Sequence, residues 1–388
     1  MDEQEAGTGL RFEHEAPAQR VRFATGGAAE AVREEVERLG GARVMVIAAP
    51  HAAGPAEKIT ATLPVVHRHG DIAMHVPVAT AERARAAAAE HRADTLVCVG
   101  GGSATGLAKA VALTTGLPIV AVPTTYAGSE ATRVWGLTEH GRKTTGTDPR
   151  VLPRAVVYDA GLTLSLPAAL SAASGLNALA HCVDSMWAPR TDPVDQALAV
   201  EGIRALNSGL PAVTADPGGL AGREQMLYGA YLAAVAFSCA GSGLHHKICH
   251  VLGGAHGLPH AQTHAVVLPY VLAFNAPAAP EAERRIAAAF GAPSALAGLR
   301  RLGTSVGAPT ALRDLGLAET DLDAAAAASL AAAPPSNPRP VTLDALRRLL
   351  RAAWAGADPS RPDPSRPDRS EPGPSDAATR EGRCGCRP

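Results

Sequence analysis

Residues 97–110 read VCVGGGSATGLAKA, an apolar run followed by three glycines and then by an Ala-rich segment. This order is typical of a buried strand, a tight turn and the start of a helix. Glycines let the backbone approach a phosphate closely, and the exposed N–H groups at the helix start hold the anion. The segment differs from the usual GxGxxG fingerprint, so on its own it also fits a turn without a ligand.

Four short apolar runs lie in the first 160 residues, at 43–49, 95–102, 117–125 and 154–160. Ala-rich segments with helical spacing lie between them, such as 81–93 and 106–116. Alternating strands and helices indicate a parallel sheet, whose strands read as continuous apolar runs when both faces are buried. We therefore predict an α/β nucleotide-binding domain with a Rossmann-like parallel sheet over residues 1–160.

The pattern changes after residue 160, where strand-like runs stop. Helical spacing occurs in three long segments, at residues 166–189, 223–241 and 280–291. We therefore predict an all-α domain over residues 161–356. Residues 357–388 repeat DPSRP and are rich in Pro, Ser and charge, so we expect a disordered tail.

Composition excludes several classes of protein. A net charge of −1 gives no basic excess for nucleic acid, and no apolar run reaches the roughly 18–20 residues needed to span a bilayer. The acidic N-terminus is unlike a secretory signal, so we expect a cytoplasmic location. Six cysteines in a chain of 388 residues do not make a disulfide framework. Four lie in apolar segments as expected buried thiols, and two lie in the tail: Cys98, Cys182, Cys239 and Cys249, and Cys384 and Cys386.

A second polar loop, PTTYAGSE at residues 123–130, follows the next apolar run. Ligands of open parallel sheets bind at the carboxyl ends of the strands, where both loops would lie. The two loops supply the candidate cofactor-binding residues Gly100, Gly101, Gly102, Ser103, Thr124, Thr125 and Ser129. The first run ends in AAPH (48–51) without the acid that binds an adenosine ribose, so we expect both NADH and NADPH to be used.

Histidines gather near residue 250, where six of the chain's 14 lie between His245 and His264. Asn177 and His181 are four residues apart, as are His246 and His250, so each pair lies on one face of a helix. VLGG (251–254) is expected to end the second helix, and His260 to follow from a loop or new turn. This pattern favours a site in a helix-lined cleft. Isolated histidines fit ordinary core or surface positions: His67, His69, His75 and His91.

Separated segments together resemble the iron-containing alcohol dehydrogenase superfamily, and within it the maleylacetate reductases. They are GGGS (100–103), TYAGSEAT (125–132), 135–154, SGLNALAHCVDSMWAP (174–189), LHHKICHVLGG (244–254), LPHAQTHAVVLPY (258–270) and NPRPVT (337–342). The resemblance covers roughly residues 10–355. It implies a dehydroquinate synthase-like fold with the active site between the two domains, and a homodimer.

The resemblance also implies an activity. NAD(P)H would reduce the carbon–carbon double bond of maleylacetate, or a substituted form, to give 3-oxoadipate during breakdown of aromatic compounds. Metal-dependent relatives carry Asp at the position of Asn177, with histidines matching His181, His246 and His260. An amide is a weaker, neutral ligand, so we expect no required metal, although three histidines can hold zinc.

The resemblance and the chemistry of the side chains assign roles. His181, His246, His250 and His260 would stabilise or protonate an enolate. His245, Lys247 and Arg339 would meet the substrate carboxylates, although Arg339 also fits a Pro-bracketed structural turn. Lys143 matches a position near the nicotinamide ribose, and His256 and His264 are expected to support the site.

Some positions depart from the family pattern, namely Arg133, Gln262, 256–257 and 334–340, and leave the exact substrate open. A metal-dependent alcohol or lactaldehyde-type dehydrogenase, a reductase of a related dicarboxylate in biosynthesis and a dehydroquinate synthase-like lyase remain alternatives. A nucleotide-binding protein without catalytic activity is another.

Overall fold

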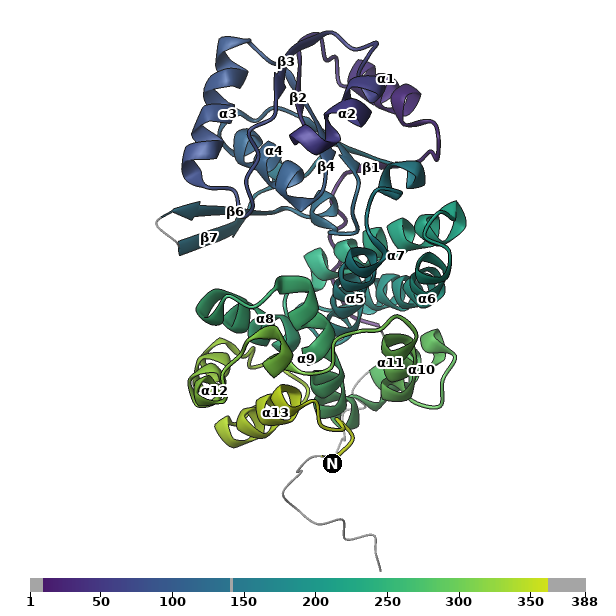
Figure 1. Ribbon diagram of the computed structural model, residues 1–388, viewed down its shortest axis with the longest axis vertical. Helices are drawn as coiled ribbons and strands as arrows, with labels where there is room; N and C mark the ends of the chain where they lie inside the picture. Colours follow the sequence, from purple (N-terminus) through teal and green to yellow (C-terminus); the bar gives the residue numbers. More distant parts are fainter. Residues whose placement is uncertain (1–9, 140–141, 362–388) are drawn as a thin grey trace, which may run out of the picture.

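The computed structural model describes residues 10–139 and 142–361, which form an α/β part followed by a helical part (Figure 1). Six strands form one parallel sheet in the order β1-β8-β5-β4-β2-β3. Their bounds are β1 Arg20–Phe23, β2 Val44–Ile47, β3 Val65–His69, β4 Thr95–Gly100, β5 Ile119–Pro123 and β8 Ala155–Tyr158. The predicted fold class is confirmed. The tail, including Cys384 and Cys386, lies outside the described residues.

The central strands are fully buried because helices cover both faces of the sheet. Val44 and Val46 of β2 pack with helices α1 (Ala28–Arg38) and α2 (Ala53–Ile59). Met45 and Ile47 point to the other face and pack with α3 (Val78–Glu90) and α4 (Gly102–Thr115). Successive side chains of a strand point to opposite faces of the sheet, so each central strand contributes to an apolar layer on both faces. The continuous apolar runs in the sequence predicted this burial.

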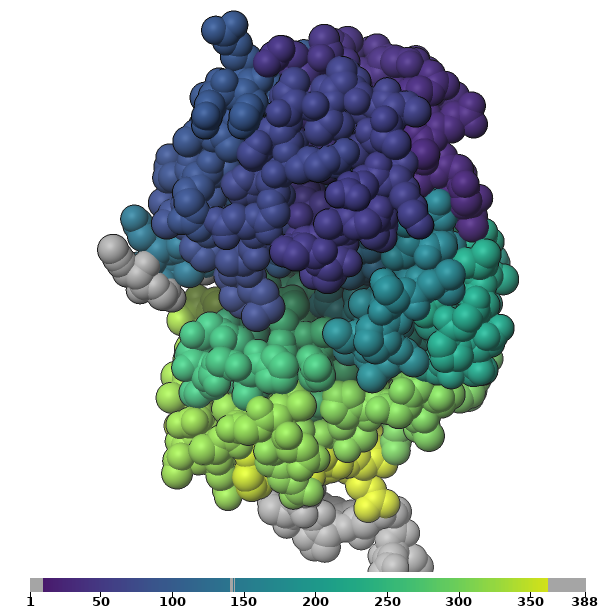
Figure 2. Space-filling model, turned by 45° about the horizontal axis from the view of Figure 1, so that its top comes forward, coloured from purple at the N-terminus to yellow at the C-terminus, as the bar shows by residue number. Residues whose placement is uncertain are grey.

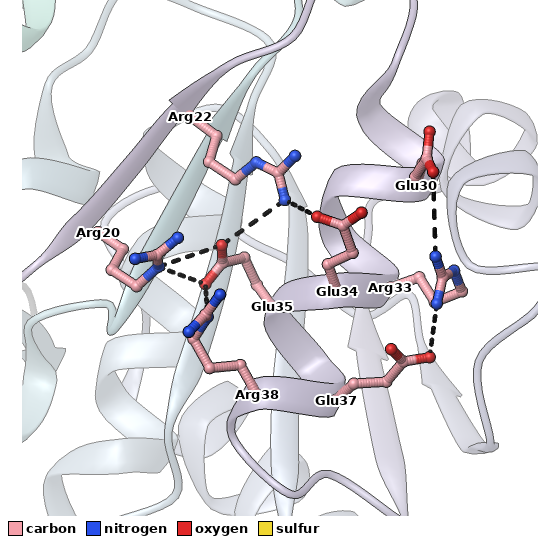
Figure 3. A network of polar contacts seen from close by, with 8 residues as sticks. All are labelled: Arg20, Arg22, Glu30, Arg33, Glu34, Glu35, Glu37 and Arg38. Atoms are coloured by element: carbon pink, nitrogen blue, oxygen red, sulfur yellow. Dashed lines mark hydrogen bonds and ion pairs between the residues drawn. The ribbon is translucent and has the colours of Figure 1, made fainter.

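The two edge strands, β1 and β3, were not predicted. β1 carries Arg20 and Arg22, whose partners lie on α1 (Figure 3). Glu35 is 1% exposed; one of its oxygens lies 3.1 Å from Arg20 Nε and the other 3.8 Å from Arg22 Nη1. Edge strands often carry charge, which prevents pairing with another chain, and such charge hides the apolar pattern of a strand. A hairpin, β6 (Val134–Glu139) and β7 (Arg142–Thr147), was also missed.

The remaining helices follow the last strand, and α5, α6 and α7 lie next to the sheet (Figure 1). Their bounds are α5 Ala168–Ser185, α6 Pro193–Ala215, α7 Leu220–Ala240, α8 Leu244–His256, α9 His260–Asn275, α10 Pro280–Phe290, α11 Ala295–Ser305, α12 Leu322–Ala332 and α13 Leu343–Ala355. Figure 2 shows the blue surface of the α/β part meeting the green surface of the helical part along a recessed boundary.

One helix boundary differs from the prediction. VLGG does not end α8, which continues through Gly253 and Gly254 to His256. A glycine inside a helix costs only about 1 kcal/mol relative to alanine, whereas the cap needs a positive φ, which Gly257 adopts at 66°. His260 then begins α9 directly after Pro259.

Cys98, Cys182 and Cys249 are buried as expected, whereas Cys239 is only partly buried. Among the described residues no single helix is long and apolar enough to cross a bilayer. The helices α7 and α8 pass that test only as a pair bent by 98°.

Candidate active site

The turn between β4 and α4 packs against the loop that follows β5. Gly100 has φ of 150°, and Thr124 N–H donates to its carbonyl at 3.1 Å. A Cβ on Gly101 would lie 2.9 Å from Thr125 Cγ2, so any larger residue would force the Thr125 side chain to shift. Gly102 begins α4, whose N-terminus has no side-chain cap within the described chain. The structure thus brings most of the candidate cofactor residues to one edge of the sheet, beside backbone N–H groups suited to a phosphate. Ser103 lies in the first turn of α4, and Ser129 begins a short 3-10 turn, η2 (Ser129–Ala131).

The same loop touches the helical part through Gly128. This residue has φ of 74°, and a Cβ on it would lie 2.8 Å from Ala234 Cβ of α7. Phe237 follows Ala234 by one turn of α7, about 5 Å along the helix. The Phe237 ring lies 4.6 Å from the His181 ring and 4.2 Å from the His246 ring, between centroids. A continuous path of contacts therefore connects the predicted nucleotide loop to the histidines.

The histidines of α5, α8 and α9 form one cluster. Neighbouring ring centroids lie 4.5–6.5 Å apart. The members are His181, His245, His246, His250, His260 and His264. His250 and His260 are exposed, whereas His246 is buried, so the cluster reaches from the interior to the surface. The structure thus brings the four predicted catalytic histidines together.

Asp184 orients the central histidine. Its Oδ2 atom lies 2.7 Å from His246 Nδ1 and accepts a hydrogen bond from the Gly243 N–H at 2.8 Å. Nδ1 therefore carries the proton, and the lone pair of a neutral His246 is on Nε2, which has no hydrogen-bond partner in the described chain. Asp184 belongs to the G-x-x-A-x-x-H-x-x-[DE] segment at 175–184, yet its contact with a helix 62 residues away could not be predicted.

His245 and His264 form a buried pair behind His246. His245 Nε2 and His264 Nδ1 lie 2.8 Å apart, and Cys249 Sγ lies 3.7 Å from His245 Nε2. His245 is 1% exposed and His246 2%, but Nε2 of His245 is engaged by His264, so the structure places His245 in a pair within the cluster and its contact with a substrate carboxylate stays a prediction. His264, expected to have a supporting role, contacts both His246 and His260 through its ring.

The other predicted substrate residues are scattered. The Arg339 guanidinium packs over the Phe274 ring, 4.5 Å from its centroid, and donates to the Phe274 carbonyl. Phe274 follows His260 by 14 residues on α9, which is about 21 Å along the helix. Arg339 therefore lies away from the cluster, as the structural-turn alternative predicts. Lys247 is half-buried on α8. The backbone of Lys143 pairs with Thr138 in the hairpin, and its side chain is outside the described part of the chain. His256 is the last residue of α8, and its Nδ1 atom lies 3.4 Å from Asp321 Oδ2.

Burial sets the charge of the cluster. It lowers the pKa of His181, His245, His246 and His264 well below the usual histidine value, and the neighbouring imidazoles lower it further. Burial also raises the pKa of Asp184, although hydrogen bonds from Gly243 and His246 oppose this. Without a ligand these four imidazoles are therefore neutral at neutral pH.

Several donor atoms of the cluster resemble the ligands of a metal centre. Asn177 Oδ1, His181 Nδ1 and His246 Nε2 are buried and lack hydrogen-bond partners among the described residues. With His260 they match a borderline cation such as Zn²⁺ in ligand type, and a cation there would polarise a carbonyl oxygen. These four residues include no carboxylate, so they would leave the charge of a cation uncompensated, although three histidines alone can hold Zn²⁺.

Comparisons with known proteins agree with this geometry. Two family models match: "Iron-containing alcohol dehydrogenase" over residues 18–160 and "Fe-containing alcohol dehydrogenase family, C-terminal" over residues 171–354. The maleylacetate reductase of Sphingobium indicum is 45% identical over 352 residues, covering 90% of this chain and 99% of that protein. That of Burkholderia cepacia is 44% identical over 351 residues, with the same shares covered.

Solved structures are similar as well. An iron-containing alcohol dehydrogenase from Corynebacterium glutamicum has a TM-score of 0.89 at 58% identity, covering 91% of this chain and 99% of that one. A maleylacetate reductase from Rhizobium sp. strain MTP-10005 has a TM-score of 0.86 at 44% identity, covering 90% and 99%.

Proposed function

This chain belongs to the iron-containing alcohol dehydrogenase family, and on that basis we propose that it is a maleylacetate reductase. It transfers a hydride from NAD(P)H to the conjugated carbon–carbon double bond of maleylacetate, or a substituted form, and gives 3-oxoadipate. The relatives that carry this name match along almost their whole length, which supports the same reaction in this chain.

One observation carries the proposal, namely the contact path from Gly128 through Ala234 and Phe237 to His181 and His246. If the phosphates of the dinucleotide bind at the start of α4, its nicotinamide end would extend along the loop that contains Gly128. Because this loop touches α7 one helical turn from Phe237, whose ring contacts His181 and His246, hydride donor and imidazoles would meet at the same substrate.

The reaction needs one hydride and one proton. Hydride adds to the carbon beta to the ketone, and the electron pair of the double bond moves to the ketone oxygen as an enolate. The enolate then takes a proton at the carbon next to the ketone, and NAD(P)⁺ remains. His246 is neutral in the free site, but the negative charge of a dicarboxylate raises the pKa of a neighbouring imidazole. A histidine can therefore gain a proton as the substrate binds and donate it to the enolate. Lys247 would meet a substrate carboxylate.

The cofactor preference is proposed to be broad. Residues 48–51 contain no acid, and Asp71, which follows β3, is engaged by Arg83 Nε at 2.7 Å. No described carboxylate at these two strand ends is therefore free to repel a 2′-phosphate, so both NADH and NADPH are expected. We further propose a metal-independent reaction, supported by Asn177 in place of an anionic ligand, and a homodimer.

The decisive assay follows NADH absorbance with maleylacetate, and separately with simple aldehydes and alcohols, before and after exhaustive chelation. Consumption of NADH with maleylacetate that survives chelation is expected. Activity only with alcohols or aldehydes, restored by one metal ion, would instead indicate a metal-dependent dehydrogenase. Turnover without net NADH consumption would indicate a lyase.

The variant His246→Ala tests the histidine cluster directly. We expect kcat to fall at least 100-fold, the usual size of an acid–base contribution, while the Kd of NADH changes little. The matched control is His91→Ala, because His91 stacks on His67 in the α/β part, outside the cluster. Near-normal turnover of the His246 variant would contradict its role.

A further inference from the structure

A second group of ionisable side chains lies outside the histidine cluster, where residues 10–19 cross the start of α6. His14 Nδ1 is 2.7 Å from Asp192 Oδ2 and 3.9 Å from Asp195 Oδ1. One ligand atom from each of the three residues lies within 4.8 Å of the other two. The two carboxylates are 8% and 1% exposed, so the group is not an ordinary solvated acidic patch.

The two aspartates differ in what they bind. Asp192 Oδ1 caps α6 by accepting the N–H groups of Val194 and Asp195 at 2.8 and 2.9 Å, which leaves Oδ2 for His14. Both oxygens of Asp195 are buried and have no hydrogen-bond donor among the described residues. A buried carboxylate without a donor is costly, so such a group normally holds a proton or a cation.

Neighbouring cations do not satisfy Asp195. Arg190 is near enough to favour its ionised form, but Arg190 Nε donates to the Cys239 carbonyl at 3.1 Å. Arg133 is bound to Glu15 at 2.7 Å. The space between His14, Asp192 and Asp195 therefore faces two carboxylates and one imidazole.

We propose that His14, Asp192 and Asp195 form a binding site for a divalent transition-metal cation such as Zn²⁺. One imidazole and two carboxylates are common ligands of such ions, and water would complete the coordination. Ligands about 2.1 Å from zinc in a tetrahedron lie about 3.4 Å apart, so these side chains need to move only about 1 Å.

The cation would fasten the N-terminal segment to both parts of the molecule. The Cys239 thiol of α7 lies 3.7 Å from the Glu15 carbonyl, while Glu15 pairs with Arg133 beyond η2. Gln19 Nε2 donates to the carbonyls of Glu130, in η2, and Pro153. A metal on His14 would therefore tighten a segment that leads to the loop of the predicted cofactor site, and its role is structural.

The test uses the full chain without an affinity tag, stripped with a chelator and dialysed at pH 7.5. ZnCl₂ is added, bound zinc is measured by elemental analysis, and the melting temperature is recorded. The variants are Asp195→Asn and His14→Gln. The matched controls are Asp148→Asn, which caps an exposed turn, and His51→Gln, an exposed histidine.

We expect each test variant to bind one zinc equivalent less than the unchanged protein and to lose the zinc-dependent rise in melting temperature. The controls keep both, and NADH-dependent activity stays within twofold in every variant. Zinc should also slow tryptic cleavage after Arg11 several-fold in the unchanged protein and in both controls, but not in Asp195→Asn or His14→Gln.

Equal zinc stoichiometry and equal melting shifts in all variants would overturn the proposal and leave a shared proton as the occupant of the carboxylates. The histidine cluster is intact in every variant, so zinc bound there cannot produce the difference. If Asp195→Asn fails to fold, His14→Gln decides, because His14 lies on an extended segment outside the helices.

Discussion

Replacement of Asp184 by Asn separates the charge of this residue from its geometry. Asp184 Oδ2 accepts from both Gly243 N and His246 Nδ1, while Oδ1 has no hydrogen-bond partner in the described chain. An amide oxygen in the place of Oδ2 keeps both bonds, and the NH₂ group takes the unpartnered position. The ring orientation and tautomer of His246 therefore survive, and only the negative charge is lost.

The expected effect follows from Coulomb's law. Two unit charges about 4 Å apart interact by about 4 kcal/mol at an effective dielectric constant near 20. The contact of 2.7 Å puts the charge centres of the carboxylate and imidazolium at about this distance. If His246 is protonated when it stabilises the enolate, removing the carboxylate costs up to this amount, which is a 10²–10³-fold loss of kcat/KM.

The assay measures NADH oxidation with maleylacetate, with chelator present, beside NADH affinity by fluorescence. Asp159→Asn is the matched control, since Asp159 is also a buried aspartate that accepts a backbone N–H, from Gly161, in η4 (Ala160–Thr163). We expect Asp184→Asn to lose activity while NADH affinity and the control stay unchanged. Activity within threefold of the unchanged enzyme would refute a charged His246. A loss that added metal restores would indicate that Asp184 instead supports a metal ligand.

Four further variants test other parts of the structure. Gly128→Ala should destabilise the protein by about 2–4 kcal/mol in urea denaturation and raise the KM of NADH, because it combines a φ of 74° with a 2.8 Å contact. Gly116→Ala, with φ of 71° and no described atom within 4 Å, should cost only about 1–2 kcal/mol. In chelator, Asp195→Asn should stabilise the protein by up to about 3 kcal/mol at pH 8 and hardly at all at pH 4. The reason is that burial raises the pKa of Asp195 from 3.8 to about 6, so the native state binds more protons between these values and loses stability as pH rises through them. Arg339→Ala should leave the substrate KM within twofold, and a tenfold increase would place Arg339 in the site after all.

The sequence predicted those parts of the fold that are buried on both sides. β2, β4, β5 and β8 read as apolar runs because helices cover both faces of the sheet. β1 could not be found in the same way, because it carries the charged residues Arg20 and Arg22. Their charge is compensated by Glu35, which lies on α1 and not on the strand itself. Their pairing depends on tertiary packing, and no local pattern shows it.

In the candidate site too, some features could be predicted from local sequence and others depend on tertiary packing. Helical spacing correctly placed Asn177 with His181 on α5 and His246 with His250 on α8. It could not show that His245, next to His246, turns to the interior to meet His264, since that depends on how α8 packs on α9. The position of Arg339 over Phe274 likewise depends on how the chain after α12 returns to α9.

The arrangement of Asp184, His246 and Asn177 explains how one cluster can serve two kinds of chemistry in a family. Nδ1 of His246 is committed to Asp184, so only the lone pair on Nε2 remains, and it can bind a cation or a proton but not both. An anionic residue at position 177 would favour a cation, because it neutralises part of the metal charge. Asn177 contributes no charge, and a dicarboxylate substrate brings its own negative charge into a neutral imidazole site, which favours the proton. If the reaction is metal-independent, as we propose, this neutrality prepares the site to take up the proton that reduction of a conjugated double bond consumes.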